Sequence, residues 1–152
     1  MRKIMFTNID IKTVYHVSKN DFDFPDYKFT LGSVGQHHAN SALGFWTSHV
    51  PGSYKSFGLK CYSMKADPSS NIKLIHYDKF KELTCYKTPE EIINLRRQLL
   101  NDNVDILCVV DSDGPMRKLA EIIFINYEKI VDFTPTKIYD KSQYERIQWR
   151  VT

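Results

Sequence analysis

The sequence lacks any long hydrophobic run, and no apolar segment approaches the roughly 20 residues that a membrane-spanning helix needs. It also lacks a cluster of lysine and arginine, because its 21 basic and 18 acidic side chains are scattered and leave a net charge of +3. This balance does not by itself indicate nucleic-acid binding, although polyanionic partners stay open. The N-terminus has a basic start without the apolar segment of a signal peptide. We therefore expect a cytoplasmic protein that does not enter a membrane.

Cysteine and glycine are scarce as well. The three cysteines, Cys61, Cys85 and Cys108, have no CxxC spacing and lie in or beside apolar segments, which favours buried thiols in a reducing compartment. His37 and His38 are adjacent and would point to opposite faces of a strand, so we expect no metal site. The six glycines form neither a GxGxxG motif nor a P-loop, so no phosphate-binding loop of those kinds is indicated.

What the chain has in quantity is aromatic residues: nine Tyr, nine Phe and two Trp. With 152 residues and 42% hydrophobic residues, we expect one globular domain, residues 1–152, of the α+β class. Period-two patterns and apolar runs predict strands at 13–18, 42–47, 59–65, 71–76, 104–110, 122–125 and about 144–151, and a further edge strand or arm within 1–12.

Helix signals are fewer. Thr88-Pro-Glu-Glu91 is a capping box with proline at the first helical position, and it precedes an apolar stripe from Ile92 to Leu100. Ser48 can cap a helix from His49 to Gly58. The segment 20–26 reads as a turn or short helix that packs Phe22 and Phe24 inward, and 31–43 reads as a loop.

Three motifs stand at the ends of predicted strands and can meet in one cleft. They are Tyr15-His16-Val17-Ser18, Gly44-Phe45-Trp46-Thr47-Ser48, and Glu121 opening the apolar run Ile122–Ile125. Each has an ordinary reading beside the functional one. A carboxylate before an apolar run is usually a strand-end charge, and aromatic residues in such positions are usually core.

The order of these motifs resembles that of the ADP-ribosyltransferase superfamily, the NAD-dependent transferases that include diphtheria-type toxins and poly(ADP-ribose) polymerases. The first motif looks like the aromatic-His-Gly-Ser/Thr sequence of that family, and the second like its Gly-x-Tyr-Phe-Ser/Thr sequence. Glu121 to Phe124, with Ile130 nine positions after Glu121, is similar to the strand that begins with the catalytic glutamate. The resemblance runs from about residue 13 to 130. It implies split mixed and antiparallel β-sheets with two or three flanking helices.

Three positions depart from the family pattern. Val17 stands where glycine is common, and Trp46 stands where tyrosine is usual. Leu119 lies two residues before Glu121, where the arginine-specific branch has Gln or Glu. His16 also stands where that branch has Arg in the first motif, and together with Leu119 it argues against arginine as the acceptor.

The resemblance also implies roles for individual residues. Glu121 would stabilise the positive charge that grows on the ribose as the bond to nicotinamide breaks. His16 would hydrogen-bond the adenosine ribose, Ser18 the nicotinamide-side ribose, and the backbone at Val17 would approach the nicotinamide amide. Trp46 and Phe57 would sandwich the nicotinamide ring, with Tyr54 as the substitute for Phe57 if the helix is rotated. A hydroxyl of Ser53 or Ser56 would contact the carboxamide.

These roles predict an NAD-dependent mono-ADP-ribosyltransferase that uses NAD as co-substrate, needs no metal and modifies an intracellular protein or nucleic acid. By analogy, small members of this kind act as toxins, bacteriophage effectors or defence enzymes. Three alternatives stay open: a catalytically silent NAD- or ADP-ribose-binding domain, an NAD glycohydrolase of the same fold, and a basic nucleic-acid-binding module. The loop from Asp111 to Ala120, with Arg117 and Lys118, is the expected acceptor-binding segment.

Overall fold

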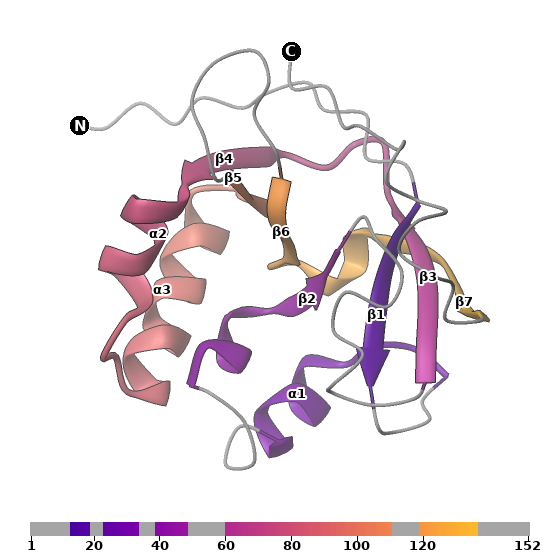
Figure 1. The fold of residues 1–152 in the computed structure, drawn as a ribbon, viewed down its shortest axis with the longest axis horizontal. Coiled ribbons are helices and arrows are strands. Elements are labelled where there is room, and N and C mark those ends of the chain that lie inside the picture. The colour runs from indigo at the N-terminus through magenta and orange to yellow at the C-terminus, as the bar shows by residue number, and fades with distance from the viewer. Residues whose placement is uncertain (1–12, 19–22, 34–38, 49–59, 111–118, 137–152) are drawn as a thin grey trace.

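The strands of this chain form two β-sheets that meet along one edge (Figure 1). The computed structural model describes residues 13–18, 23–33, 39–48, 60–110 and 119–136. One sheet is antiparallel and has three strands, in the order β1 (Val14–Ser18), β3 (Lys60–Ala66) and β7 (Ile130–Thr136). Strand β7 was not predicted from the sequence; it follows η4 (Tyr127–Lys129) directly.

The second sheet has four strands and is mixed. Its order is β2 (Phe45–Thr47), β6 (Leu119–Phe124), β5 (Ile106–Val110) and β4 (Ile72–His76). Strands β4 and β5 are parallel, whereas β5–β6 and β6–β2 are antiparallel. The two sheets are joined by one bridge between Tyr15 and Ser48, whose backbone groups exchange hydrogen bonds of 2.7 and 2.9 Å. The predicted α+β class, with one mixed and one antiparallel sheet, is confirmed.

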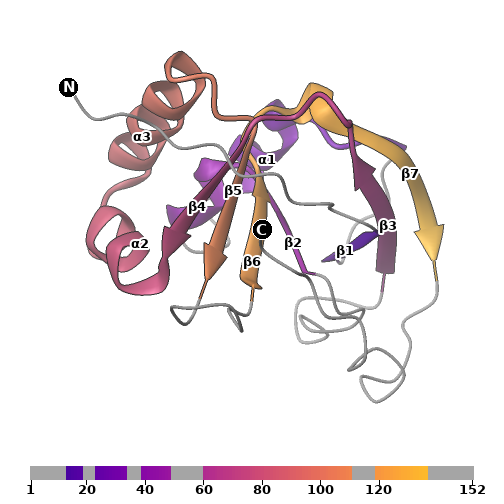
Figure 2. The ribbon, with the colours of Figure 1, turned by 90° about the horizontal axis from the view of Figure 1, so that it is seen from above.

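Two helices, α2 (Tyr77–Thr84) and α3 (Pro89–Asn101), connect β4 to β5 and lie on one side of the four-stranded sheet, opposite the three-stranded sheet (Figure 2). The predicted capping box of α3 is confirmed, because the Thr88 hydroxyl accepts from the Glu91 N–H and the Glu91 carboxylate accepts from the Thr88 N–H, both at 3.2 Å. Helix α2 was not predicted. Its N-cap is His76, whose Nδ1 accepts from the Asp78 N–H, and histidine is not a usual capping residue.

The hydrophobic core has two parts, one on each face of the four-stranded sheet. The part between the sheets joins Val14, Tyr62 and Met64 to Ile122 and Phe124. The part beneath the helices joins residues of α2 and α3 to the other face of the sheet, and consists of Ala42, Leu43, Ile75, Phe80, Ile92, Leu99, Val104, Leu107, Val109, Ile123 and Ile125. All five residues of β5 are buried, as a strand covered on both faces requires.

The segment expected to be a loop between 31 and 43 is partly helical. Helix α1 (Tyr27–Ser33) runs into it, and a 3-10 helix, η2 (Ala39–Leu43), precedes β2. Asp26 initiates α1, because its carboxylate accepts from the Lys28 N–H at 2.9 Å. The prediction that Phe24 packs inward is wrong: its side chain is 49% exposed and meets only the edge of Phe133 among the described aromatic rings, at 5.8 Å.

The cysteines divide into two kinds. Cys61 and Cys108 are buried as predicted, but Cys85 is exposed because it follows the last turn of α2 in the short connection to α3. Several predictions lie outside the described residues: the arm within 1–12, the inward packing of Phe22, His37 and His38, the helix 49–58, and the strand near 144–151. Among the described helices, none is both long and apolar enough to cross a membrane.

Candidate active site

Glu121 lies inside strand β6 rather than at its start. The strand begins at Leu119, and Glu121 pairs with Val109 of β5, just before a register shift between Val109 and Val110. The expectation that Glu121 opens the strand is therefore corrected by two residues, because the apolar pattern that marked the strand begins only at Ile122. The Glu121 side chain is half-buried. Because side chains alternate along a strand, it is directed to the same face of the sheet as Ile123.

His16 lies on β1, and its side chain reaches across to the neighbouring sheet. Its Nδ1 atom is 2.6 Å from the carbonyl oxygen of Trp46, and its ring stacks on Phe45 with 4.0 Å between the centroids and 26° between the planes. Phe45 is part of the core between the sheets. This hydrogen bond and this ring contact thus join the motif on β1 to the motif on β2, in addition to the Tyr15–Ser48 bridge.

This geometry determines the protonation state of His16. A carbonyl oxygen can only accept, so Nδ1 carries the proton. Desolvation of the ring lowers the pKa of His16 to about 4, and the hydrogen bond to Trp46 opposes this effect only in part. At neutral pH the imidazole is therefore uncharged, and its Nε2 atom is an acceptor.

The Trp46 indole lies on the other side of the four-stranded sheet from the His16 ring. Adjacent residues of a strand point to opposite faces, so Phe45 faces the three-stranded sheet and Trp46 faces the helices. The indole N–H donates to the Asn40 carbonyl oxygen at 3.1 Å, and the ring meets Phe80 of α2 edge-on at 5.8 Å. His16 and Trp46 therefore approach through the Trp46 backbone and not through their rings.

Trp46 shares its face with Glu121. Trp46 pairs with Ile123 of β6, and Glu121 is two residues before Ile123 on the same face. The two side chains are therefore diagonal neighbours across β2 and β6, a separation within reach of a tryptophan ring. The half-buried carboxylate and the partly buried indole therefore lie on the same face of the four-stranded sheet.

Gly44 and Thr47 set the position of β2. A Cβ atom on Gly44 would overlap the Phe124 carbonyl oxygen and lie 3.1 Å from Ile123 Cγ2, so only glycine fits here. At the other end of the strand, the buried Thr47 hydroxyl donates to the Ile122 carbonyl oxygen at 2.7 Å. The glycine and the hydroxyl residue of the second motif thus hold β2 against the strand that carries Glu121.

The three motifs converge at the end of β2. Thr47 pairs with Ile122, so Ser48 comes level with Glu121 on one side, and on the other side Ser48 bridges to Tyr15, which precedes His16. The strand β2 thus lies beside β1, about 30 residues earlier in the chain, and beside β6, about 75 residues later.

The remaining predicted site residues divide into described and undescribed ones. Val17 is buried, pairs with Cys61 and faces away from His16; Ser18 pairs with Lys60, faces the same side as His16 and is half-buried. Ser53, Ser56, Tyr54 and Phe57 lie outside the described residues, as does most of the acceptor segment.

Sequence reasoning missed the roles of Phe45 and Asn40. Phe45 supports the His16 ring, and Asn40 holds the indole of Trp46. Alternation along β2 could have assigned Phe45 to the face opposite Trp46, but no signal in the expected loop marked Asn40.

The described residues contain no group of three or more His, Cys, Asp or Glu side chains that could hold a metal ion. No family model, curated protein or solved structure matches this chain. The site is therefore interpreted from its own residues.

Proposed function

We propose that this protein is an NAD-dependent mono-ADP-ribosyltransferase with the split-sheet fold of that superfamily. The observation that carries the proposal is the convergence of the three motifs at the end of β2, with the His16 ring on one face of the four-stranded sheet and the Trp46 and Glu121 side chains on the other. A neutral histidine, an aromatic ring and a half-buried carboxylate suit a nucleotide that carries a cationic nicotinamide ring and ribose hydroxyls.

NAD would supply the ribose–nicotinamide bond, which breaks with its electron pair going to nicotinamide while an acceptor nucleophile bonds to the ribose carbon and loses its proton to water. Glu121 would stabilise the positive charge on the ribose; losing a group placed in this way typically costs about 3 kcal/mol of activation free energy. Neutral His16 would accept a hydrogen bond from a ribose hydroxyl at Nε2. The Trp46 ring, diagonal to Glu121, would form one wall of the nicotinamide site.

The test is nicotinamide release from NAD by the wild-type protein and Glu121→Gln, with and without cell lysate. Glu90→Gln, an exposed glutamate in the first turn of α3, is the matched control. We expect release that falls at least 100-fold in Glu121→Gln, is unchanged in Glu90→Gln and rises with lysate.

Other outcomes assign the site differently. Release that needs Glu121 but is indifferent to lysate identifies an NAD glycohydrolase. Binding of NAD without release by the wild type identifies a silent nucleotide-binding domain. If the wild type neither binds NAD nor releases nicotinamide, the proposal is overturned, and salt-dependent binding of nucleic acid then becomes the measurement to make.

A further inference from the structure

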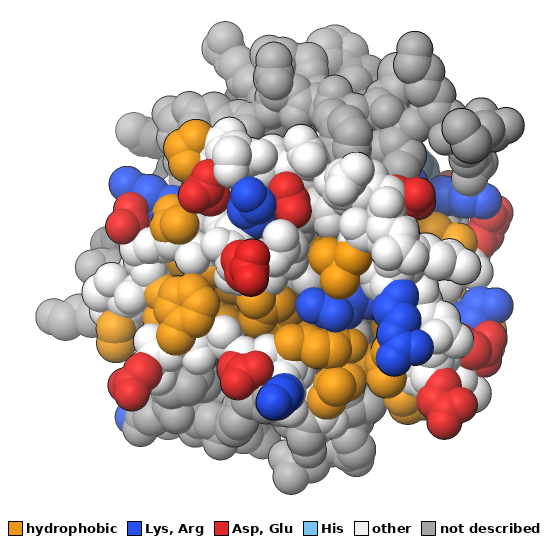
Figure 3. Space-filling view, turned by 180° about the vertical axis from the view of Figure 1, so that it is seen from behind, with side chains coloured by type: hydrophobic (Ala, Val, Ile, Leu, Met, Phe, Trp, Pro, Cys, Tyr) orange, Lys and Arg blue, Asp and Glu red, His pale blue; other side chains and the backbone are white. Residues whose placement is uncertain are grey.

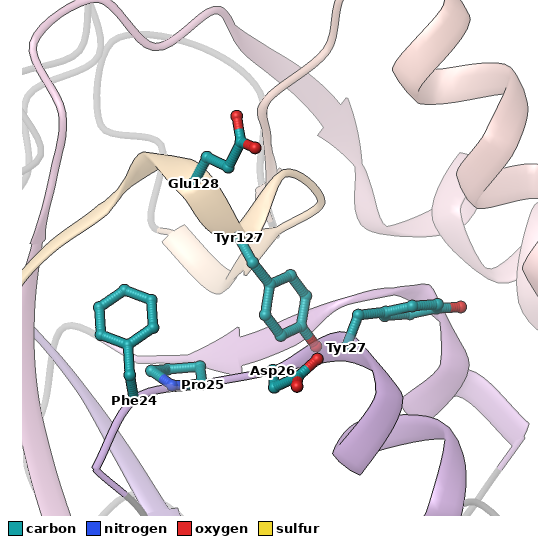
Figure 4. A pocket seen from close by; sticks show the side chains of 6 residues that line it. All are labelled: Phe24, Pro25, Asp26, Tyr27, Tyr127 and Glu128. Atoms are coloured by element: carbon teal, nitrogen blue, oxygen red, sulfur yellow. The ribbon is translucent and has the colours of Figure 1, made fainter.

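A pocket of about 480 Å³ lies where α1 begins. Its lining residues come from two segments, Phe24, Pro25, Asp26 and Tyr27 before and at the start of α1, and Tyr127 and Glu128 after β6. Glu121 is near the beginning of β6, whereas Tyr127 follows its end, so the pocket and Glu121 lie towards opposite ends of that strand. Figure 4 shows the side chains of Phe24 and Tyr27 on either side of Tyr127.

The aromatic walls of this pocket are held in place by their own contacts. The Tyr27 and Tyr127 rings meet edge to face at 5.7 Å. The Tyr27 hydroxyl donates to the Ala42 carbonyl oxygen at 2.6 Å, and the Tyr127 hydroxyl is 2.7 Å from the Thr30 hydroxyl. Because both hydroxyls are engaged and Tyr127 is buried, the rings form a preorganised wall.

Two carboxylates border the aromatic rings. In Figure 4 the Asp26 side chain lies beside the Tyr127 hydroxyl, whereas the Glu128 side chain lies at the backbone end of Tyr127 and points away from Asp26. Within the described part of the chain, neither carboxylate forms an ion pair. Among the described residues, the lining has two acidic side chains and no basic one.

The same aromatic cluster already binds one cation of the chain itself. The guanidinium carbon of Arg96 lies 3.6 Å from the centre of the Tyr27 ring, and this side chain also donates to the Ile125 carbonyl oxygen at 3.1 Å. Arg96 thus covers Tyr27 from the α3 side and is not part of the lining. Its charge reduces the negative potential of the pocket, but the two carboxylates of the lining outnumber it.

We propose that this pocket docks a lysine or arginine side chain presented by a partner protein. The aliphatic stem would pack on the exposed Phe24 ring, and the cationic group would lie beside the exposed Asp26 carboxylate, with Glu128 adding negative charge from the far end of the lining. Two observations favour this occupant: the charge of the lining, and the exposure of Phe24, which at 49% is high for a large apolar side chain. Figure 3 shows a band of apolar side chains across the face opposite that of Figure 1, bordered by acidic side chains and by Lys and Arg side chains. Exposed apolar regions with polar borders are typical of protein interaction sites.

The test is an NMR titration of the ¹⁵N-labelled full chain with acetyl-Gly-Lys-Gly-amide and acetyl-Gly-Arg-Gly-amide, with acetyl-Gly-Gln-Gly-amide as the neutral probe. We expect saturable shifts of the amides around Phe24 and Glu128 with the two cationic peptides only. The double variant Asp26→Asn/Glu128→Gln should weaken binding at least fivefold, and Phe24→Ala about two- to fivefold. Asparagine at position 26 can still cap α1, so the fold is kept.

Glu90→Gln is again the control, because it removes one exposed carboxylate elsewhere. Glu90→Gln and Glu121→Gln should both bind the cationic peptides as tightly as the wild type does. The proposal would be overturned if the glutamine peptide caused the same shifts as the cationic peptides, or if neither cationic peptide caused a saturable shift. It would also be overturned if Glu90→Gln weakened binding as much as Asp26→Asn/Glu128→Gln does. Shifts that change with protein concentration alone would assign the pocket to a second copy of this chain and also overturn it. Nicotinamide release is a separate readout, so the two proposals stand or fall independently.

Discussion

His16 Nδ1 lies 2.6 Å from the carbonyl oxygen of Trp46, so a side chain of the three-stranded sheet is hydrogen-bonded to the backbone of the four-stranded sheet. Beside this bond, the Tyr15–Ser48 bridge links the backbones of the two edges. The imidazole therefore helps to tie the two sheets together where they meet.

The stability of the protein should fall as the pH drops from 6.5 towards 4. The folded-state pKa of His16 is about 4 against 6.5 for the ordinary side chain, so in this range the unfolded chain binds a proton that the folded chain does not. The contribution of neutral His16 to the free energy of unfolding is therefore complete above pH 6.5. It is lost as the pH falls, by up to about 3 kcal/mol. Urea unfolding of the wild type and His16→Gln at several pH values measures this. A slope between pH 6.5 and 4 that is the same in both proteins would contradict the prediction.

Gly44→Ala should destabilise the fold by about 2–4 kcal/mol, because the new methyl group would overlap the Phe124 carbonyl oxygen. The overlapping atom is backbone of β6 and cannot rotate away as a side chain would. The midpoint of chemical unfolding measures the loss. Ser41→Ala, at a half-buried position three residues earlier in η2, is the control and should change stability by less than about 1 kcal/mol.

Asp105→Ala should lower the free energy of unfolding by about 2–4 kcal/mol. The nearly buried Asp105 carboxylate accepts from the Asn71 N–H at 2.8 Å and from the Asn126 side-chain amide at 3.1 Å, and both donors would lose their partner. These bonds connect the residues that precede β4 and β5 to those that follow β6. Asp102→Ala, at the exposed C-cap of α3, should have a much smaller effect in the same unfolding measurement. Equal losses of stability in Asp105→Ala and Asp102→Ala would contradict this prediction.

One thiol of the native protein should react rapidly with Ellman's reagent. Cys85 is exposed, whereas Cys61 and Cys108 are buried and burial raises the pKa of Cys108 to about 12, so it has almost no thiolate. Cys85→Ser should abolish the rapid phase, and unfolding in guanidinium should make the remaining thiols reactive. A rapid phase that persists in Cys85→Ser would mean that a buried cysteine is accessible.

Local signals were sufficient where an element is specified by its own residues. The capping box at Thr88, the apolar run of β5 and the alternation in β3 each predicted the element that the structure has. Helix α2 was missed because its cap is a histidine, and β7 because Asp132 adopts a positive φ of 53° and Pro135 interrupts the pattern. The exposure of Cys85 depends on where α2 ends, which the local sequence did not indicate.

The sequence by itself determined that three motifs exist and that each lies near a strand end, because strand periodicity and the bordering residues are local properties. It also contained the glycine at 44, although the reason for it, the approach of the Phe124 carbonyl, is visible only between strands. Only the tertiary structure decided which side chains face each other. The register of β2 against β6 directs Trp46 to the side of Glu121, and the bridge at Tyr15 directs His16 to the side of Phe45. A shift of one residue in either pairing would reverse these faces, and register is set by long-range packing that no local pattern contains.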